Sequence, residues 1–207
     1  MQYRAVFFDL GGVVLGSPLH AIAEYEHERG IPQGFINRVV VASGPSGAWS
    51  RLERGLLSME EFQSAFDAEC DAAGQAIDAR ALMGRVHLAS APRPLMLEAI
   101  RRIRGRGLST GAITNNWVSD GEGTRELRPN FDAFVESCVT GVRKPDPQIY
   151  RIACDELGVE PARAVFLDDI GANLKPARAL GMTTIKVDEP RGALRALGGV
   201  LGFEVLG

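Results

Sequence analysis

Short apolar runs that each stop at a polar residue are the clearest pattern in this sequence. Four of them have the length and composition of buried β-strands, at residues 5–8, 110–113, 164–167 and 184–187. The residues that follow these runs are Asp9, Thr114, Asp168 and Asp188. Each predicted strand therefore delivers a polar side chain at its carboxyl end.

Helical patterns separate the last three predicted strands. One covers residues 146–157 and is opened by Pro145, and another covers 173–180 and is closed by Gly181. Strands that alternate with helices indicate an α/β fold with a doubly wound parallel sheet. Ligands of such folds bind beyond the carboxyl ends of the strands, so we expect the polar residues there to converge.

About a hundred residues lie between the first two predicted strands, far more than the dozen or so that a single crossover helix needs. They read as several helices, the clearest at 58–73, where Ser58 and Glu61 have the spacing of a capping box. We therefore expect a core domain made of residues 1–16 and 92–207 and a small inserted helical cap at 17–91. The segment 89–95 is predicted to be the hinge by which the chain returns to the core.

Composition excludes some partners. The 23 basic and 26 acidic residues among 207 leave a net charge of -3, which is not typical of a nucleic-acid-binding protein. Cys70, Cys138 and Cys154 have no metal-ligand spacing and are predicted to be buried thiols of a reducing compartment. No signal peptide and no apolar run of 18 residues is present, so we expect a cytoplasmic protein without a membrane partner.

Acidic residues at two strand ends indicate a metal site. A carboxylate at the end of a buried strand, such as Asp9, is costly unless it is paired or bound to a metal. Asp168 and Asp169 follow a second strand. Three carboxylates at one sheet edge would repel one another unless a hard divalent cation lay between them, and Mg²⁺ is the simplest candidate.

A metal at this edge would favour a phosphate ligand. Thr114 and Asn115 offer a hydroxyl and an amide after the second strand, and Lys144 offers a positive charge at the predicted start of a helix. The partner that these groups suggest is a small phosphorylated substrate.

Each of these residues also has an ordinary structural explanation. Asp9 could begin a turn with Gly11, and Thr114 with Asn115 could form a turn or a helix cap. Lys144 could be a solvated surface residue, Asp168 and Asp169 an exposed pair in a loop, and Asn173 the cap of the next helix. Their occurrence together, in order and at strand ends, favours a functional site.

These residues resemble the motifs of the haloacid dehalogenase (HAD) superfamily of phosphohydrolases, whose core is a Rossmann-like sheet. Asp9 matches the nucleophile motif, Thr114 the second motif, Lys144 the third, and Asp168 with Asp169 the fourth. The stretches ITNNW, ESCVTGVRKPDPQIY and VFLDDIGANLKPARALGMTTIKV are similar to the amino-terminal phosphatase domain of soluble epoxide hydrolases and to the HAD-like domain of acyl-CoA dehydrogenase family members. Because the sequence stops at Gly207, no α/β-hydrolase domain is expected and epoxide hydrolysis is not implied.

The resemblance implies a role for each motif residue. Asp9 would attack phosphorus and form an aspartyl-phosphate, which water then hydrolyses. Mg²⁺ would be held by Asp9, the main-chain carbonyl of Gly11 and Asp169. Phosphoryl oxygens would be bound by Thr114, the Asn115 region and Lys144, while Asp168 and Asn173 would support the metal shell and its loop.

Gly11 departs from the pattern of the phosphatases, which usually carry a second aspartate at this position. With glycine in place of the second aspartate, the backbone carbonyl can still bind a metal, but the side chain that acts as general acid and base is missing. General acid–base catalysis typically contributes a factor of 10² to 10⁴ in rate. Ser17 and His20, just downstream, are candidates for a substitute, although a lone histidine at a helix start, such as His20, is more often a solvated surface group.

Three functions remain open from the sequence. The first is a slow or narrow Mg²⁺-dependent phosphatase for esters or acyl phosphates, and the second is a domain that binds a phosphate ester or a partner without catalysis. The third is a metal-independent 2-haloacid dehalogenase, which the second aspartate of the pair, Asp169, disfavours. Substrate choice would rest with the cap, where four residues either line a pocket or pack the cap's own core: Trp49, Arg51, Phe62 and Phe66.

Overall fold

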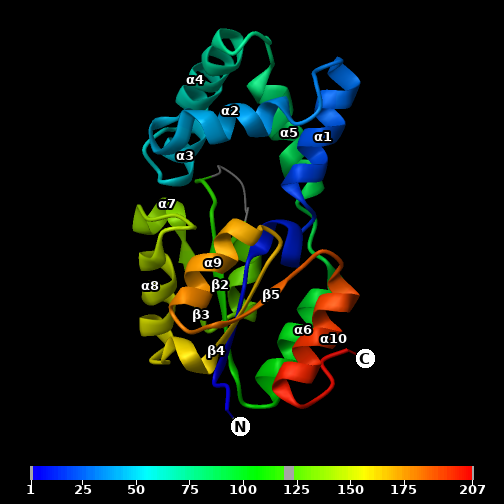
Figure 1. Ribbon diagram of the computed structural model, residues 1–207. Helices are drawn as coiled ribbons and strands as arrows, with labels where there is room; N and C mark the ends of the chain where they lie inside the picture. Colours follow the sequence, from blue (N-terminus) through cyan, green and yellow to red (C-terminus); the bar gives the residue numbers. More distant parts are fainter. Residues whose placement is uncertain (1, 119–123, 207) are drawn as a thin grey trace.

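The computed structural model describes residues 2–118 and 124–206. It shows a parallel sheet flanked by helices, with a separate group of helices at one end of that sheet (Figure 1). The five strands have the order β3-β2-β1-β4-β5. They are β1 (Ala5–Phe8), β2 (Ser109–Thr114), β3 (Ala133–Glu136), β4 (Ala164–Asp168) and β5 (Thr183–Lys186).

All strand pairs are parallel, which confirms the predicted α/β fold class. The four predicted strands are present with ends that differ by one residue at most. The prediction missed β3, a strand of only four residues at the edge of the described sheet, where it pairs with β2. Asp132 before this strand and Glu136 at its end interrupt the apolar run, so the segment lacks the continuous apolar pattern of the inner strands.

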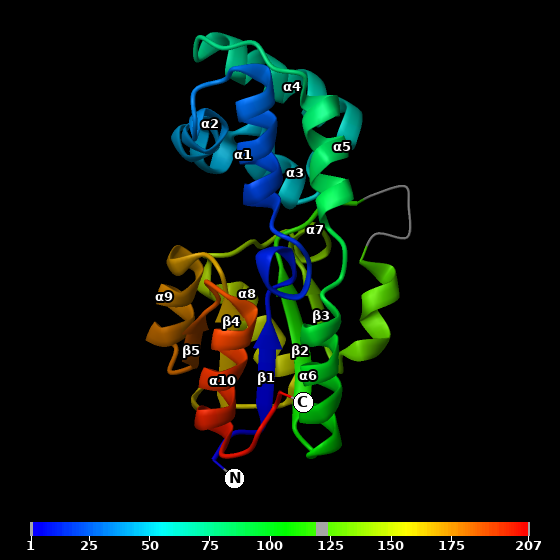
Figure 2. The ribbon, with the colours of Figure 1, turned by 90° about the vertical axis from the view of Figure 1, so that its right-hand side faces the viewer.

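Two pairs of helices cover the faces of the sheet (Figure 2). Val6 and Phe8 of β1 pack in one cluster with α6 (Pro94–Gly105) and α10 (Pro190–Leu201). The alternate β1 residues face a second cluster, with α8 (Pro147–Leu157) and α9 (Gly171–Ala179). Because β1 is buried on both faces, its sequence is a continuous apolar run.

Both predicted helix starts after the second strand need correction. Helix α8 begins at Pro147, and Asp146 is its N-cap, whose side chain accepts a hydrogen bond from the Gln148 N–H. Helix α9 begins at Gly171, so Asn173 lies in its first turn and does not cap it. Lys144 lies in a turn ahead of the helix, and the Lys144–Pro145 peptide is cis.

The inserted segment folds into five helices with a hydrophobic cluster of their own. Phe62 and Phe66 stack at 5.3 Å, and Trp49 packs edge-on against both, so these three side chains form the cap core while Arg51 is exposed. The predicted capping box of Ser58 and Glu61 is present. The helices are α1 (Pro18–Arg29), α2 (Phe35–Ser43), α3 (Ala48–Glu53), α4 (Met59–Ala72) and α5 (Ala79–Ala89).

Several single turns complete the structure. A π-helical turn follows β1, and short 3₁₀ turns and one four-residue helix join the larger elements. They are η1 (Leu10–Val14), η2 (Gly44–Ser46), η3 (Arg125–Asn130), α7 (Ser137–Thr140) and η4 (Pro161–Arg163).

Two adjacent segments connect the cap helices to the core. Leu15 forms an antiparallel bridge with Pro92, and the Gly16 N–H donates to the Ala91 carbonyl at 3.0 Å. The Arg93 N–H donates to the Val14 carbonyl at 2.8 Å. These contacts place the predicted hinge segment beside the outgoing chain, and the exact domain boundaries stay a prediction.

Cys70 and Cys154 are buried thiols, as predicted, but Cys138 is only half-buried. Cys138 belongs to α7, a single turn at the surface of the core, where too little chain covers it to bury the thiol. Among the described residues, none of the helices has the length and hydropathy needed to span a bilayer.

Candidate active site

Three of the four predicted strand-end residues meet at the carboxyl edge of the sheet. Asp9 follows β1 at the centre of the sheet, Thr114 ends β2, and Asp168 ends β4, with strands β2 and β4 on either side of β1. The fourth, Asp188, is exposed after the edge strand β5 and pairs with Lys186 at 2.5 Å. The expectation that Asp188 joins the site is therefore wrong, because its strand lies at the sheet's edge.

Lys144 joins the two central carboxylates. Its Nζ lies 2.8 Å from Oδ1 of Asp9 and 2.7 Å from Oδ2 of Asp168. All three side chains are buried, so Lys144 is not a solvated lysine. The sequence position of Asp9 called for a cation or donor nearby, and this ammonium group is that partner.

Burial and neighbouring charges shift the pKa values of Lys144, Asp9 and Asp169. Burial opposes the charge of Lys144, but Asp9 and Asp168 outweigh it and raise the pKa of the ammonium group. Burial, opposed by Lys144 and reinforced by Asp168, raises the pKa of Asp9 well above its usual range. Burial and then the charge of Asp168 raise the pKa of Asp169 to about 6. The raised pKa values of Asp9 and Asp169 show that Lys144 alone does not offset the cost of ionising these carboxyls together.

Hydrogen bonds from Asn173 and from the backbone hold the Asp168 carboxylate in place. Oδ1 of Asp168 accepts a hydrogen bond from the Ile170 N–H at 2.7 Å, and Nδ2 of Asn173 lies 3.1 Å from both oxygens of Asp168. The Tyr150 hydroxyl in turn donates to the Asn173 carbonyl at 2.7 Å. With Lys144 also bound, both oxygens of Asp168 already have protein partners.

Asn115 holds the backbone of Lys144. Its Oδ1 accepts from the Lys144 N–H at 2.8 Å, and its Nδ2 donates to the Lys144 carbonyl at 3.0 Å. The side-chain amide of Asn115 is thus used to position Lys144, a role that sequence reasoning missed. The predicted contact of Asn115 with phosphate stays a prediction, as does that of Thr114, which lines the same cavity.

The donor set fits a hard divalent cation. One carboxylate oxygen each of Asp9, Asp168 and Asp169 can be chosen so that all lie within 4.8 Å of one another. Three ionised carboxylates facing one ammonium group leave an excess of two negative charges, the charge that Mg²⁺ would balance. Because both oxygens of Asp168 have protein partners, Asp9 and Asp169 are the better side-chain ligands.

The loop after Asp9 is shaped around Asp169. Gly12 has a φ of 75°, and a Cβ atom there would lie 2.5 Å from Cγ of Asp169. Nη1 of Arg93 donates to the carbonyls of Gly12 at 2.7 Å and Val13 at 3.2 Å and so fixes the same loop. Arg93 is a second residue that the sequence did not single out.

Neither suggested substitute for the missing acid lines the cavity above the site. Gly11 does line it, and a Cβ atom at Gly11 would lie 3.1 Å from Cγ of Pro18. Ser17 is buried at the hinge and His20 is exposed, and both lie outside the cavity lining. The position of His20 fits a solvated residue at the start of α1.

A cavity of about 1310 Å³ lies between the cap and the strand ends. Its floor includes Asp9, Thr114, Lys144 and Asp169. Much of its cap wall is apolar, including Leu19, Ile22, Ile36, Val40, Trp49, Leu57, Met59, Met83 and Val86. Trp49 therefore both packs the cap and lines the cavity, whereas Phe62, Phe66 and Arg51 do not line it.

Two curated relatives match nearly the whole chain. Mouse acyl-CoA dehydrogenase family member 10 is 39% identical over 207 residues, which are 98% of this chain and 19% of that protein. Pig bifunctional epoxide hydrolase 2 is 36% identical over 222 residues, covering 100% of this chain and 40% of that protein. The chain thus spans less than half the length of either relative.

Solved structures and a family model agree with this relationship. A HAD family enzyme from Bacteroides thetaiotaomicron, solved in complex with magnesium and inorganic phosphate, superposes with a TM-score of 0.66 at 18% identity, covering 89% of this chain and 93% of that one. The family of haloacid dehalogenase-like hydrolases matches residues 3–181. This chain therefore belongs to the haloacid dehalogenase-like hydrolases.

Proposed function

We propose that this protein is a Mg²⁺-dependent phosphatase that acts through an aspartyl-phosphate on Asp9. The observation that carries the proposal is the cluster of buried Asp9, Lys144 and Asp168 with half-buried Asp169, at the floor of a large cavity that Asp9, Lys144 and Asp169 line. Its excess negative charge needs a cation, and a cation there attracts a phosphate group. A small phosphorylated substrate is the partner that fits.

Asp9, Asp169 and the main-chain carbonyl of Gly11 would hold the ion. Bound Mg²⁺ would neutralise charge on the phosphoryl oxygens and on the facing carboxylates. Asp168 would not need to bind the ion directly, because its hydrogen bonds already orient Lys144, Asn173 and the loop at Ile170.

Asp9 is placed to act as the nucleophile. One oxygen of its carboxylate is held by Lys144 and by the Leu10 N–H at 2.7 Å, which fixes the orientation of the group. The carboxylate would attack phosphorus, and water would then release phosphate and restore Asp9. Lys144 would bind a phosphoryl oxygen and keep the charge of Asp9 balanced through the cycle.

The cavity wall favours esters with an apolar organic part. Its apolar side chains come mainly from the cap helices, whereas the charged groups of the site lie at its floor. A substrate would therefore point its phosphate toward Asp9 and its organic part toward the cap. We expect KM to fall as the apolar part of a phosphate ester grows within this volume.

Two other functions compete with this one. The Bacteroides relative with magnesium and inorganic phosphate supports phosphate chemistry in this fold. A metal-independent 2-haloacid dehalogenase would gain nothing from the added charge of Asp169, and a pure binding module would gain nothing from a nucleophile fixed by Lys144. The cytoplasmic location and the cap boundaries at 17 and 91 stay part of this proposal.

One comparison tests the proposal. The purified protein is given an aryl phosphate and a 2-haloacid, each with Mg²⁺ or with a chelator. The proposal predicts phosphate release that needs Mg²⁺ and no halide release. Halide release in chelator would favour the dehalogenase, and binding of phosphate and Mg²⁺ without turnover would favour the binding module.

A further inference from the structure

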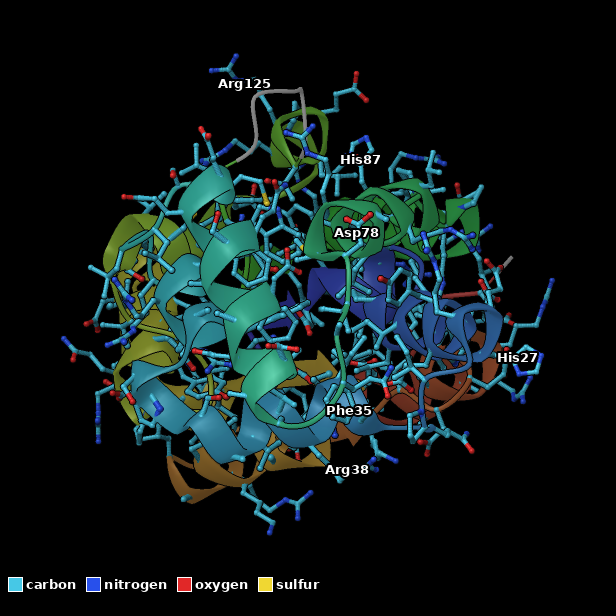
Figure 3. The ribbon with its side chains drawn as sticks, turned by 90° about the horizontal axis from the view of Figure 1, so that it is seen from above. His27, Phe35, Arg38, Asp78, His87 and Arg125 are labelled. Atoms are coloured by element: carbon cyan, nitrogen blue, oxygen red, sulfur yellow. The ribbon has the colours of Figure 1, made fainter. Side chains whose placement is uncertain are left out.

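A buried carboxylate in the cap has no part in the reaction as outlined above. Glu53, the last residue of α3, is 7% exposed and lines the cavity. The other ionisable cap residues of the described chain that line this cavity, Glu60, Arg80 and His87, are exposed, and Figure 3 shows His87 at the outer edge of α5. Burying a carboxylate is costly, so the position of Glu53 needs a reason.

The two oxygens of Glu53 have different surroundings. Oε1 accepts a hydrogen bond from Nε1 of Trp49 at 3.1 Å. Oε2 lies 2.7 Å from Nε of Arg143, but the two groups are not aligned as a hydrogen bond. Within the described part of the chain, these two buried atoms have no hydrogen-bond partner. Oε2 is therefore the oxygen of Glu53 that is ion-paired with Arg143 but forms no hydrogen bond.

Arg143 ties Glu53 to the catalytic loop. It directly precedes Lys144, and its Nη1 donates to Oγ of Ser50 on α3 at 2.6 Å. Cap helix α3 also contacts α7 of the core. Gly55, just after α3, lies so close to α7 that a Cβ atom there would be 2.6 Å from the carbonyl oxygen of Cys138. The carboxyl of Glu53 is thus held over the core by contacts on the Lys144 side of the site.

The geometry of the proposed reaction places the leaving oxygen on the cap side of the site. Strand β1 runs toward the cap (Figures 1 and 2). Asp9 directly follows the last residue of this strand. In an in-line displacement the leaving oxygen departs on the side of phosphorus opposite the nucleophile, which here is the cap side. Gly11 has no side chain with which to protonate it, so a proton donor has to come from another element.

The surroundings of Glu53 suit a proton donor. Burial raises the pKa of its carboxyl, against Arg143, the Trp49 hydrogen bond and Lys144, which lower it. The charged groups acting on it, Arg143 and Lys144, both come from the core. The acid form is favoured by burial, and the carboxylate, once formed, has a guanidinium group beside it.

We propose that Glu53 supplies and takes back the proton of this reaction in place of the side chain that Gly11 lacks. The inference rests on the proposed phosphatase function. As Asp9 attacks phosphorus, the bond from phosphorus to the leaving oxygen breaks, its electron pair stays on that oxygen, and the oxygen takes the proton of Glu53. The alcohol leaves, and the Glu53 carboxylate is stabilised by Arg143.

The second half of the reaction restores both groups. Water attacks the aspartyl-phosphate at phosphorus and gives one proton to the Glu53 carboxylate. The bond from phosphorus to Asp9 breaks and its electron pair returns to the Asp9 carboxylate. The net change is ester plus water to alcohol plus phosphate, with Glu53 protonated again.

Glu53 could alternatively do no more than fasten the cap through Arg143. Leaving groups separate these roles, because an alkoxide needs a proton as it departs whereas a stabilised aryloxide needs little help. A loose cap would slow both kinds of ester by a similar factor. A missing proton donor would slow alkyl esters far more than aryl esters.

The experiment compares kcat for an alkyl phosphate and an aryl phosphate in wild type, Glu53→Gln and Ser50→Ala. Glutamine keeps the size of Glu53 and an acceptor for Trp49 but cannot donate an acid proton. We expect Glu53→Gln to lower alkyl turnover by about 10²-fold or more and aryl turnover by less than about tenfold. Ser50→Ala, which removes only the second contact of Arg143 with α3, should change both esters by the same small factor.

Equal losses on both esters, or no loss, in Glu53→Gln would overturn the role of Glu53 while leaving the phosphatase intact. Asp9→Asn serves as the separate test of function, since it should abolish turnover of both esters. Failure of the wild type on both esters would overturn the phosphatase and this inference together.

A second variant keeps Glu53 and tests its titration, and it remains informative if Glu53→Gln does not fold. Arg143→Met removes the cation beside the carboxyl and should raise the pKa of Glu53. The limb over which alkyl kcat/KM falls with rising pH should then move to higher pH. An unmoved limb, measured on folded Arg143→Met protein, would contradict the assignment.

Discussion

The carboxylate of Asp169 packs on the backbone of Gly12, where a Cβ atom would lie 2.5 Å from Cγ of Asp169. The two residues come from loops after different strands, β1 and β4, that pair in parallel at the centre of the sheet. This contact brings Asp169 against the loop whose first residue is Asp9. The proposed metal site therefore depends on a glycine at position 12.

We predict that Gly12→Ala loses most of the response to Mg²⁺, measured as the rise of Tm on adding the ion. The alanine would need a positive φ and would also displace Asp169. Gly30→Ala is the matched control, because Gly30 also has a positive φ, 64°, but no atom within 4 Å of its Cβ position. It should cost about 1 kcal/mol of stability and keep the Mg²⁺ response. A full Mg²⁺ response in Gly12→Ala would argue against Asp169 as a ligand.

Mg²⁺ should stabilise the protein more at about pH 7.5 than at about pH 5. The pKa of Asp169 is raised to about 6, above the usual aspartate value, so between about pH 4 and 6 the folded apoprotein holds a proton that the unfolded chain has lost. Stability of the apoprotein falls as pH rises through this window, and a bound cation would relieve that loss. Calorimetry with and without Mg²⁺ at both pH values measures the difference, and Asp169→Asn should remove it.

Lys144→Met should destabilise the fold strongly, by about 3 to 5 kcal/mol, because two buried carboxylates lose their shared cation. Lys144 lowers the pKa of Asp9, which burial raises, so without the ammonium group that pKa would rise further and the folded variant would bind more protons than its unfolded form. The loss should therefore shrink as pH falls toward about 5. Urea unfolding at several pH values provides the test. A loss that does not depend on pH would indicate that packing, and not charge, dominates.

The sequence was sufficient for the parts of this site that depend on local pattern. Apolar runs that end in aspartate marked β1 and β4, and parallel topology then brought Asp9 and Asp168 together. Strand β3 was not predicted because Asp132 and Glu136 interrupt its short apolar run.

The burial of Glu53 in the cap could not be predicted from the sequence, for a different reason. Glu53 lies in a stretch, WSRLERG, that reads as an ordinary amphipathic helix with an exposed acidic residue. Its burial arises where α3, which also carries Trp49, meets the loop of Arg143, ninety residues further along the chain. The hydrogen bonds between the Asn115 side chain and the Lys144 backbone are likewise long-range contacts. Asn115 was a candidate site residue only because it follows Thr114.

The role of Gly11 can be tested by restoration. We predict that Gly11→Asp, introduced into the Glu53→Gln variant, recovers alkyl phosphate turnover, because it returns a carboxyl to the loop after Asp9. The backbone at Gly11 has a φ of -60°, which suits any residue, and Pro18 would have to move by a few tenths of an ångström. Gly11→Ala in the same background is the control for this crowding and should recover nothing. Equal turnover in the two double variants would contradict the account.

The most direct test of the central claim is the rate of phosphate release from an aryl phosphate with Mg²⁺, for wild type and Asp9→Asn at equal concentration. An aryl ester needs little acid help, so the outcome does not depend on Glu53 or Gly11. Asp9→Asn keeps the size of the side chain and should stay folded, which circular dichroism checks. The account predicts steady release by wild type and background release by Asp9→Asn, whereas comparable release by both proteins would contradict nucleophilic attack by Asp9.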